Sequence, residues 1–240
     1  MKHEYSSTKT LAAVICSLLI AGIVIDGALL FLGIFEKLYF PGIWNAGPDD
    51  AMGDAEALFV IAYLLIAVLS ATIFAVTIGF FLVWIKRSYR NLSFFGVQAL
   101  NSTPGWAVGY WFIPILSFYY PLKIVNEIYH GSDPEIEPAD IRVSDDSTPL
   151  MHGIWWALWV VGSIAGNISL RISLSSENAS MIEIAEIADL ALLPLWMACA
   201  WFAYSVVSEI TRRQEIVGNA QAEFSPPAPP TFGDYQNESL

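Results

Sequence analysis

Residues 57–85, ALFVIAYLLIAVLSATIFAVTIGFFLVWI, contain no charged side chain and decide the class of fold. As a helix, with a rise of about 1.5 Å per residue, this stretch would reach about 43 Å. That exceeds the roughly 30 Å hydrocarbon core of a bilayer, so the stretch predicts a spanning helix that tilts or projects beyond the core. The basic cluster WIKRSYR follows, with Lys86, Arg87 and Arg90, and predicts a cytoplasmic position for this end.

Three other apolar stretches are long enough to cross a bilayer, at about residues 11–35, 153–174 and 187–209. In the whole chain 55% of residues are hydrophobic and 14% are charged, which is too little charge to cover the helices of a soluble protein. The formal net charge of -12 leaves no basic stripe for phosphates, so no nucleic-acid partner is expected. We predict an all-α polytopic membrane helix bundle with four transmembrane helices.

The remaining segments have different characters. Residues 1–10 are predicted as a cytoplasmic N-terminus, and residues 11–212 as the transmembrane domain. Residues 91–103 are mildly amphipathic and predict a short helix that lies along the membrane surface. Residues 213–240 end in FSPPAPPTFGDYQNESL, and this Pro-rich, acidic composition predicts a disordered tail.

The segment at 104–129, PGWAVGYWFIPILSFYYPLKIVNEIY, is too aromatic and too interrupted by prolines for an ordinary spanning helix. Lys and Arg are enriched in cytoplasmic loops, and their positions test whether this segment crosses the membrane. If it does not cross, nine of these residues lie inside and two outside, whereas a crossing gives six inside and five outside. We therefore predict a re-entrant or interfacial segment with both termini cytoplasmic, and five spans are the alternative.

Several motifs in and around this segment carry a family resemblance. RNL at 90–92, PGWAVGYWFIP at 104–114, Pro121, EIY at 127–129 and WWALW at 155–159 together resemble the DUF4328 family of bacterial membrane proteins. The resemblance is close over roughly residues 86–160, and it implies a multi-span protein of a bacterial plasma membrane, with no mechanism. Its motif residues are expected to be structural: Arg90, Asn91, Pro104, Trp106, Gly109, Trp111, Pro114, Pro121, Glu127 and Trp156.

Charged side chains inside spans are functional candidates, because burying a charge in lipid is costly. Asp26, Asn167, Arg171 and Asp189 fall at similar depths in the predicted outer half of the bundle and could form one polar cluster. Such a cluster could bind a ligand or an ion. The blander alternatives are a structural ion pair of Arg171 with an aspartate, or side chains hydrated near the interface.

Other titratable residues give weaker signals. Glu183, Glu186 and Asp189 share one helical face, which predicts either a cation-attracting mouth or a solvated turn of helix. Five potential ligands have no spacing typical of a metal site, so no metal is predicted. They are His130, Asp133, Glu135, Glu137 and His152.

Glu127 follows the aromatic segment, four residues after Lys123, and an ion pair within one helix is the simple interpretation. The alternative is that Glu127 faces Arg87 or Arg90 and pins the aromatic segment to the preceding span. Cys16 and Cys199 both lie in apolar stretches and are interpreted as core residues rather than a disulfide.

The chain contains no G-x-S-x-G elbow, P-loop, G-x-G-x-x-G turn or H-E-x-x-H motif, so neither an enzyme nor a cofactor is expected. The leading hypothesis is a non-enzymatic membrane scaffold or interaction protein, with the bilayer and a membrane or cytoplasmic protein as partners. The alternative is a small-molecule or ion transporter or channel that uses the polar cluster.

Overall fold

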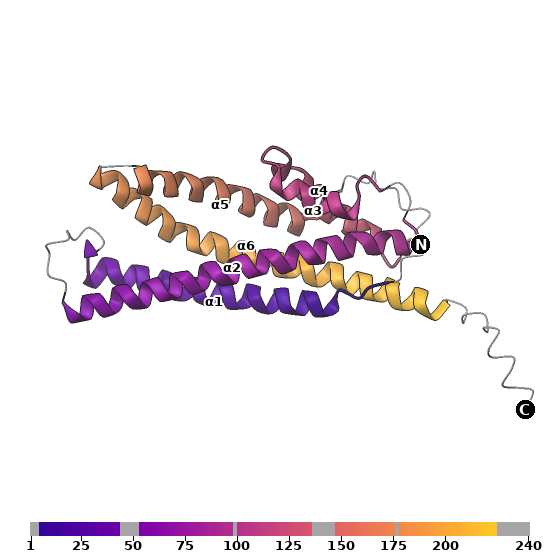
Figure 1. The fold of residues 1–240 in the computed structure, drawn as a ribbon, viewed down its shortest axis with the longest axis horizontal. Coiled ribbons are helices and arrows are strands. Elements are labelled where there is room, and N and C mark those ends of the chain that lie inside the picture. The colour runs from indigo at the N-terminus through magenta and orange to yellow at the C-terminus, as the bar shows by residue number, and fades with distance from the viewer. Residues whose placement is uncertain (1–4, 44–52, 98–99, 136–146, 176–177, 225–240) are drawn as a thin grey trace, which may run out of the picture.

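The computed structural model describes residues 5–43, 53–97, 100–135, 147–175 and 178–224, and the regular elements in this part of the chain are all helices. Four long helices run side by side (Figure 1), and each is long and apolar enough to cross a membrane. They are α1 (Lys9–Tyr39), α2 (Asp54–Phe95), α5 (Leu150–Ser175) and α6 (Ala179–Phe224). Four short helices lie between α2 and α5: α3 (Pro104–Gly109), η2 (Tyr110–Phe112), η3 (Leu116–Phe118) and α4 (Tyr120–Gly131). The predicted all-α bundle with four candidate spans is confirmed.

The described chain begins and ends at the same end of the bundle, where Tyr5 contacts the ring of Phe95 and the carboxylate of Glu215. We call this end the base, and the opposite end, where α1 and α5 terminate, the far end. Helix α1 packs along both α2 and α6, and α5 packs along α6. Helices α2 and α5 diverge toward the far end (Figure 1). The bundle is therefore closed at its base and splayed beyond it.

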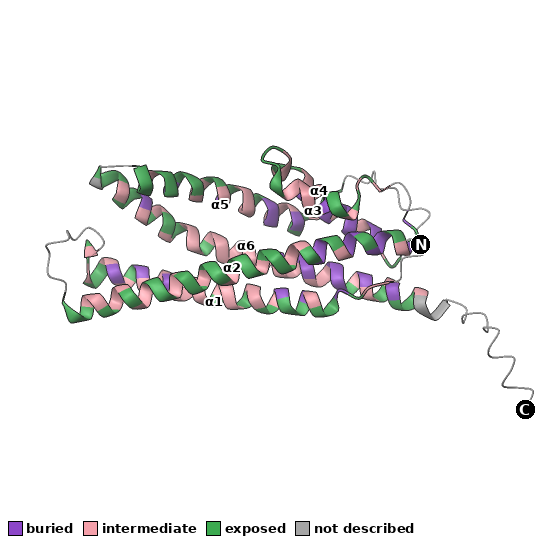
Figure 2. Ribbon diagram, in the orientation of Figure 1, coloured by how far each residue is buried: buried purple, intermediate pink, exposed green. Residues whose placement is uncertain are grey.

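Burial follows the same gradient along the bundle. Trp84, Tyr89 and Leu92 near the base are fully buried, whereas Ile61 and Leu65 toward the far end are more than half exposed. Figure 2 shows most of the buried residues gathered at the base and a mixture of exposed and intermediate residues beyond it. Exposed apolar side chains on helices whose backbone groups are satisfied internally are what lipid contact requires. The apolar far half thus fits the bilayer, and the base is the tightly packed part.

Helix α2 continues ten residues beyond the predicted span, to Phe95, so the predicted separate surface helix at 91–103 is wrong. Leu92 and Phe95, the apolar residues at the start of that stretch, are buried against the rest of the base. The helix ends at Gly96, which has φ 84°. Glycine adopts this left-handed conformation without the steric cost of a Cβ, and it is a common helix terminator.

Helix α6 likewise passes the predicted end of the transmembrane domain at residue 212 and reaches Phe224. The boundary of the predicted disordered tail is therefore wrong, and residues 225–240 lie outside the described part of the chain. Gln214 is fully buried, and a Cβ on Gly218 would lie 2.5 Å from the ring of Tyr5. Tertiary packing at the base explains why the helix continues where composition alone favours a tail.

The aromatic segment enters and leaves at the base. At its start the backbone N–H of Ser102 donates to the Tyr89 hydroxyl, and at its end Ser132 accepts from Gln214. Its middle reaches along the bundle as far as Trp156, whose indole N–H donates to the carbonyl of Phe118 at 3.1 Å. The segment therefore returns to the end of the bundle from which it started, which agrees with the predicted re-entrant or interfacial segment and not with a fifth span.

Two glycines of α5, Gly162 and Gly166, lie in different surroundings. A Cβ on Gly162 would lie 2.9 Å from both Leu195 and Trp196 of α6, whereas one on Gly166 meets nothing within 4 Å. We expect Gly162→Val to lower the free energy of unfolding by about 1–3 kcal/mol through overpacking. Gly166→Val is the matched control and should leave the melting temperature in detergent almost unchanged. Equal losses in the two variants would contradict the close packing of α5 on α6.

Candidate functional site

A buried polar network holds the base together around Asn91 of α2. Its amide N–H groups donate to the Ser6 carbonyl at 3.0 Å and to Gln214 Oε1 at 3.1 Å, and its oxygen accepts from the Ser6 backbone N–H. Gln214 in turn donates to the Ser88 carbonyl and to Ser132 Oγ. A buried polar group is stabilising only when it is hydrogen-bonded, and these groups satisfy one another. The network joins the chain's beginning, α2, α4 and α6.

Arg213, next to Gln214 on α6, connects this helix to the end of the aromatic segment. Its guanidinium lies 3.8 Å from the centre of the Tyr129 ring and donates to the Tyr129 hydroxyl at 2.6 Å. It also pairs with Asp133 at 3.0 Å and with Glu209 at 2.9 Å. The side chain is only 15% exposed, so these contacts are shielded from water. A guanidinium suits this place because it can stack on an aromatic ring and donate hydrogen bonds to carboxylates at the same time.

Glu127 is buried and caps the turn that precedes the aromatic segment. Its Oε1 accepts from the backbone N–H of Asn101 at 2.8 Å, while Oε2 has no hydrogen-bond partner. No ion pair joins it to Lys123, Arg87 or Arg90 in the described structure, so both predicted salt bridges are wrong. Arg87 instead donates to the Ser7 carbonyl. Glu127 therefore holds the segment through a hydrogen bond to the Asn101 backbone rather than through an ion pair.

Burial raises the pKa of Glu127 above its usual value near 4.5, and the Asn101 N–H and the Tyr89 hydroxyl offset this only in part. A raised pKa means that the folded protein keeps a proton that the unfolded chain has already released. Stability is therefore expected to fall as pH rises from 4.5 through the raised pKa, and then to level off. Glu127→Gln keeps an acceptor for Asn101 and should flatten this part of the melting-temperature profile. Glu183→Gln, an exposed carboxylate at the far end, is the control, and an unchanged slope in Glu127→Gln would contradict the assignment.

The other motif residues mostly build this base. Pro104 and Pro121 start α3 and α4, where their missing N–H groups cost nothing. The ring of Trp106 lies against Gly109, and Trp111 and Trp156 stack edge to face at 5.8 Å. Three motif side chains are exposed, and they are Arg90, Trp106 and Pro114. The structural role of the motif stays a prediction.

The hypothetical polar cluster in the outer half is not brought together by hydrogen bonds or ion pairs in the described structure. Asn167 donates to the Ser163 carbonyl of its own helix, and Arg171 and Asp189 are exposed. Asp26 on α1 instead accepts a hydrogen bond from Ser70 of α2 at 3.0 Å. Similar depth in the bundle did not predict contact among these residues, because depth does not determine which face of its helix a residue occupies. Of the four, Asp26 alone remains a candidate.

One residue of the acidic face at the start of α6, Glu186, forms an ion pair with Lys37. Lys37 of α1 contacts Glu186 at 2.7 Å and Glu36 at 3.4 Å, while Glu183 is exposed. The acidic face that could have attracted a cation is therefore partly neutralised by Lys37 of the same chain. Among the described residues no group of three or more histidines, cysteines, aspartates or glutamates is placed to hold a metal ion, and Glu137 lies outside them. His130 contacts the Ser147 carbonyl, and His152 contacts Asn126.

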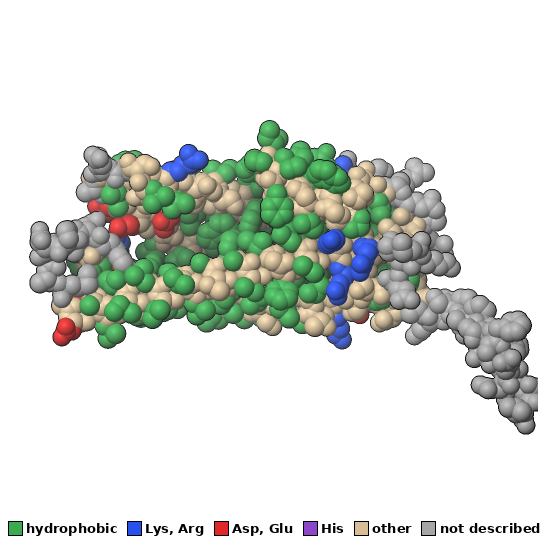
Figure 3. Space-filling view, viewed as in Figure 1, with side chains coloured by type: hydrophobic (Ala, Val, Ile, Leu, Met, Phe, Trp, Pro, Cys, Tyr) green, Lys and Arg blue, Asp and Glu red, His purple; other side chains and the backbone are tan. Residues whose placement is uncertain are grey.

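A cavity of about 500 Å³ lies inside the bundle, beyond the packed base. It is lined by α1, α2, η2, α5 and α6, with Phe81, Trp111 and Trp155 among its walls. Phe81 contacts Trp111 at 5.5 Å and Trp155 at 6.0 Å, so these rings form a partition toward the base. Figure 3 shows a hollow between α5 and α2 with hydrophobic side chains at its floor. The divergence of these two helices therefore leaves the cavity open sideways, toward the bilayer.

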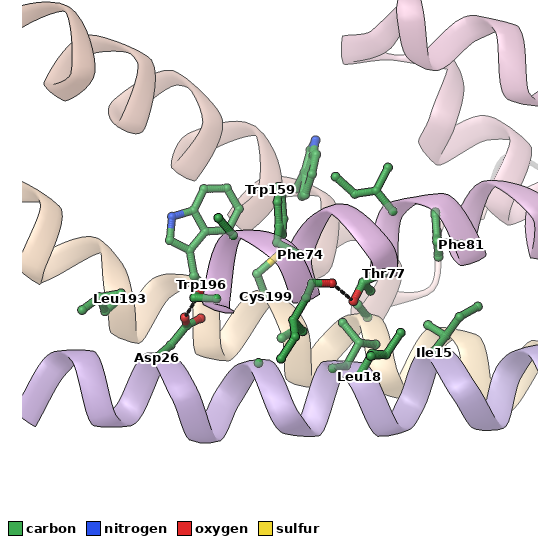
Figure 4. Close-up of a pocket in the computed structure, with 18 of the residues that line it drawn as sticks. Ile15, Leu18, Asp26, Phe74, Thr77, Phe81, Trp159, Leu193, Trp196 and Cys199 are labelled. Atoms are coloured by element: carbon green, nitrogen blue, oxygen red, sulfur yellow. Dashed lines mark hydrogen bonds between the residues drawn. The ribbon is translucent and has the colours of Figure 1, made fainter. Parts of the chain in front are cut away.

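The cavity wall is apolar except at a few points. Asp26 and Ser70 form its hydrogen-bonded polar spot, and Thr77 uses its hydroxyl on the Ile73 carbonyl of its own helix. Figure 4 shows Asp26 pointing from α1 toward α2 near Trp196. An apolar cavity of this size with a small number of polar groups is typical of small-molecule sites.

The sequence identified Asp26 but not the aromatic residues that line the same cavity, Phe74 and Trp196. Both lie in long apolar stretches where every residue satisfies the requirement for lipid, so nothing marks those that face inward. The hydroxyl of Ser70, inside a charge-free span, was the available signal for a polar spot. Trp111 connects the family motif to the cavity, because it belongs to the motif and lines the wall.

The fold and the cavity define a class, a four-helix membrane bundle with a re-entrant aromatic segment and an intramembrane cavity. The family model described as "Domain of unknown function (DUF4328)" matches residues 47–214, which is more than half of the chain. The chain belongs to this family. No curated protein and no solved structure matches the chain.

Proposed function

We propose that this membrane protein is non-enzymatic and binds a small amphiphilic molecule that enters from the bilayer, as the binding step of a carrier. The observation that carries the proposal is the cavity of about 500 Å³ between α2 and α5. Small-molecule sites are usually largely pre-formed, mostly apolar and in this size range. The base below the cavity is fully packed, so the bilayer side offers the natural entrance. This is the small-molecule form of the transport hypothesis, with the cavity in place of the outer polar cluster.

Filling the cavity tests the proposal. A Cβ on Gly22, which lines the cavity, meets nothing within 4 Å, so a larger side chain there can occupy the empty space. We expect Gly22→Phe to abolish saturable binding of the neutral dye Nile red to the purified protein in detergent micelles. Gly79→Phe is the matched control, because Gly79 is exposed, has equal room and does not line the cavity. Unchanged Nile red binding in Gly22→Phe would rule out the cavity as the site.

The second candidate is the interaction protein, and the exposed tip of the aromatic segment favours it. Phe112, Ile115 and Tyr119 are 71%, 83% and 65% exposed. A photoreactive amino acid at position 115 distinguishes the two contacts available to this tip. A cross-linked protein of one discrete mass would support an interaction partner, and cross-links to lipid alone would assign the tip to the bilayer.

We further propose a bacterial plasma membrane location with the base in the cytoplasm. Five basic residues gather at the base, where Figure 3 shows a group of Lys and Arg side chains. They are Lys86, Arg87, Arg90, Arg212 and Arg213. The proposed orientation also agrees with the unequal distribution of Lys and Arg along the chain.

Cysteine labelling checks this orientation. In a background lacking Cys16 and Cys199, we expect Ser175→Cys at the far end to react with a membrane-impermeant maleimide in intact cells. Asn219→Cys at the base should react only after the cells are permeabilised. Both positions are exposed in the structure. The reverse pattern would invert the orientation and leave the cavity proposal untouched.

A further inference from the structure

The cavity holds one carboxylate without a cation. Asp26 Oδ1 accepts from Ser70 at 3.0 Å, Oδ2 has no partner, and no Lys, Arg or His among the described residues pairs with Asp26. Asp26 is half-buried in a mostly apolar wall, and one hydroxyl offsets only part of the cost of taking a carboxylate out of water. An intramembrane carboxylate is therefore expected to have a positively charged partner, a proton or a ligand.

The cationic side chains in the described part of the chain pair with other groups or are directed outward. Lys37, which lies on the same helix, contacts Glu36 and Glu186 at the far end. Arg171 of α5 is exposed. The cationic side chains at the base lie beyond the partition formed by Phe81, Trp111 and Trp155. None of the cationic side chains that the structure describes pairs with Asp26, so a cation beside it would come with the occupant of the cavity.

Three aromatic rings in the cavity wall suit the same charge. Phe74, Trp159 and Trp196 contact one another, with ring centres 6.1 Å apart for Phe74 and Trp159 and 5.8 Å for Trp159 and Trp196. Faces of aromatic rings attract cations, most strongly where water is excluded. The aliphatic part of the wall, which includes Leu18 and Leu193, is suited to the apolar body of the same molecule. These residues are shown in Figure 4.

We propose that the cavity binds a lipophilic monocation, an organic ammonium or phosphonium amphiphile, with Asp26 as its counter-ion and Phe74, Trp159 and Trp196 as its aromatic wall. The proposal rests on the proposed function and names the class of ligand. The cation replaces the missing partner of Asp26. Neutral molecules of similar size can enter the same cavity but gain nothing from the carboxylate.

Binding of tetraphenylphosphonium to the purified full chain in detergent micelles tests the proposal. We expect Asp26→Asn to weaken tetraphenylphosphonium binding by about tenfold or more, as removal of one partner of a buried charge pair does. Nile red binding should stay within about twofold, because the cavity keeps its shape. Asp189→Asn removes an exposed carboxylate outside the cavity and is the matched control for charge. Asp26→Glu restores the charge and should recover most of the binding.

A measurement on the unaltered protein makes the test independent of how well the variants fold. Tetraphenylborate has the shape of tetraphenylphosphonium and the opposite charge, and we expect it to bind at least about tenfold more weakly. Equal affinity for the two ions, or equal phosphonium binding by Asp26→Asn, overturns the role of Asp26. If Nile red still binds and Gly22→Phe blocks it, the proposed function survives that result. If no probe binds in the cavity, both proposals fail.

Discussion

Replacing Trp84 with alanine is expected to lower the free energy of unfolding by about 3–5 kcal/mol, as truncation of a fully buried Trp does. Trp84 is 0% exposed and fills the space between α2 and α6 at the base. Its indole N–H donates to Thr211 Oγ1 at 3.1 Å, and its ring lies 5.5 Å from Phe81. The alanine variant loses this packing and leaves the Thr211 hydroxyl without its donor. We therefore expect the partition below the cavity to loosen as well.

The apparent melting temperature in detergent measures this loss, and a decrease of about 10 °C is expected for a chain of this size. Trp201→Ala is the matched control, because Trp201 lies on the same helical bundle but is 59% exposed on its outer surface. Its removal should change the melting temperature by a few degrees at most. If Trp84→Ala and Trp201→Ala had equal effects, the assignment of the core to the base would be wrong.

Asn91→Leu is expected to destabilise the protein by about 3 kcal/mol or more, because it breaks the centre of the polar network. Leucine is close in size but offers no hydrogen bond. Gln214 Oε1 then stays buried without its donor, at a cost of about 1–3 kcal/mol, and the half-buried Ser6 backbone groups also lose their partners. The chain's beginning should therefore detach from α2 and α6 before the helices separate.

Two measurements separate this effect from a general loss of stability. Limited proteolysis should cut near Ser6 in Asn91→Leu at temperatures where the rest of the bundle resists the protease. Asn219→Leu changes an exposed asparagine on α6 and should leave both the melting temperature and the protease pattern unchanged. Equal protection of the N-terminal segment in Asn91→Leu and the unaltered protein would show that the network does not hold it.

Much of the architecture follows from the sequence alone, because a segment that crosses lipid must be a long, apolar and nearly uncharged helix. The uncharged stretch at 57–85 has to be a spanning helix, since only a helix satisfies its own backbone groups in hydrocarbon. The unequal distribution of Lys and Arg then distinguishes a re-entrant segment from a fifth span. The structure agrees, because Ser102 and Ser132 at the two ends of the segment both contact the base.

The sequence was least informative where the helices leave the membrane. Composition could not show that α2 continues to Phe95 or that α6 continues to Phe224. Both extensions depend on contacts between residues far apart in the chain, such as Asn91 with Gln214 and Tyr5 with Glu215. The Pro-rich composition after residue 224 also led to the prediction of a tail that began at residue 213, although residues 213–224 are helical.

The candidate site shows the same limit. Asp26 was identifiable, because a charge inside a span is rare. Its partner was not, since depth along a helix does not fix the face, and the predicted neighbours Asn167 and Arg171 point elsewhere. Apolar stretches that face lipid have no strict periodicity, so Phe74 and Trp196 could not be assigned to the cavity side from sequence.

The most direct test of the central claim is photoaffinity labelling of the full chain in liposomes with a lipophilic amine that carries a diazirine. Mass spectrometry then locates the labelled residues. If the cavity is the binding site, adducts should map to its lining on α1, α2 and α6, at positions such as Leu19, Ala71 and Ala200, and excess tetraphenylphosphonium should suppress them. Adducts confined to the outward-facing residues Ile61, Leu65 and Val68, and unaffected by tetraphenylphosphonium, would contradict the account.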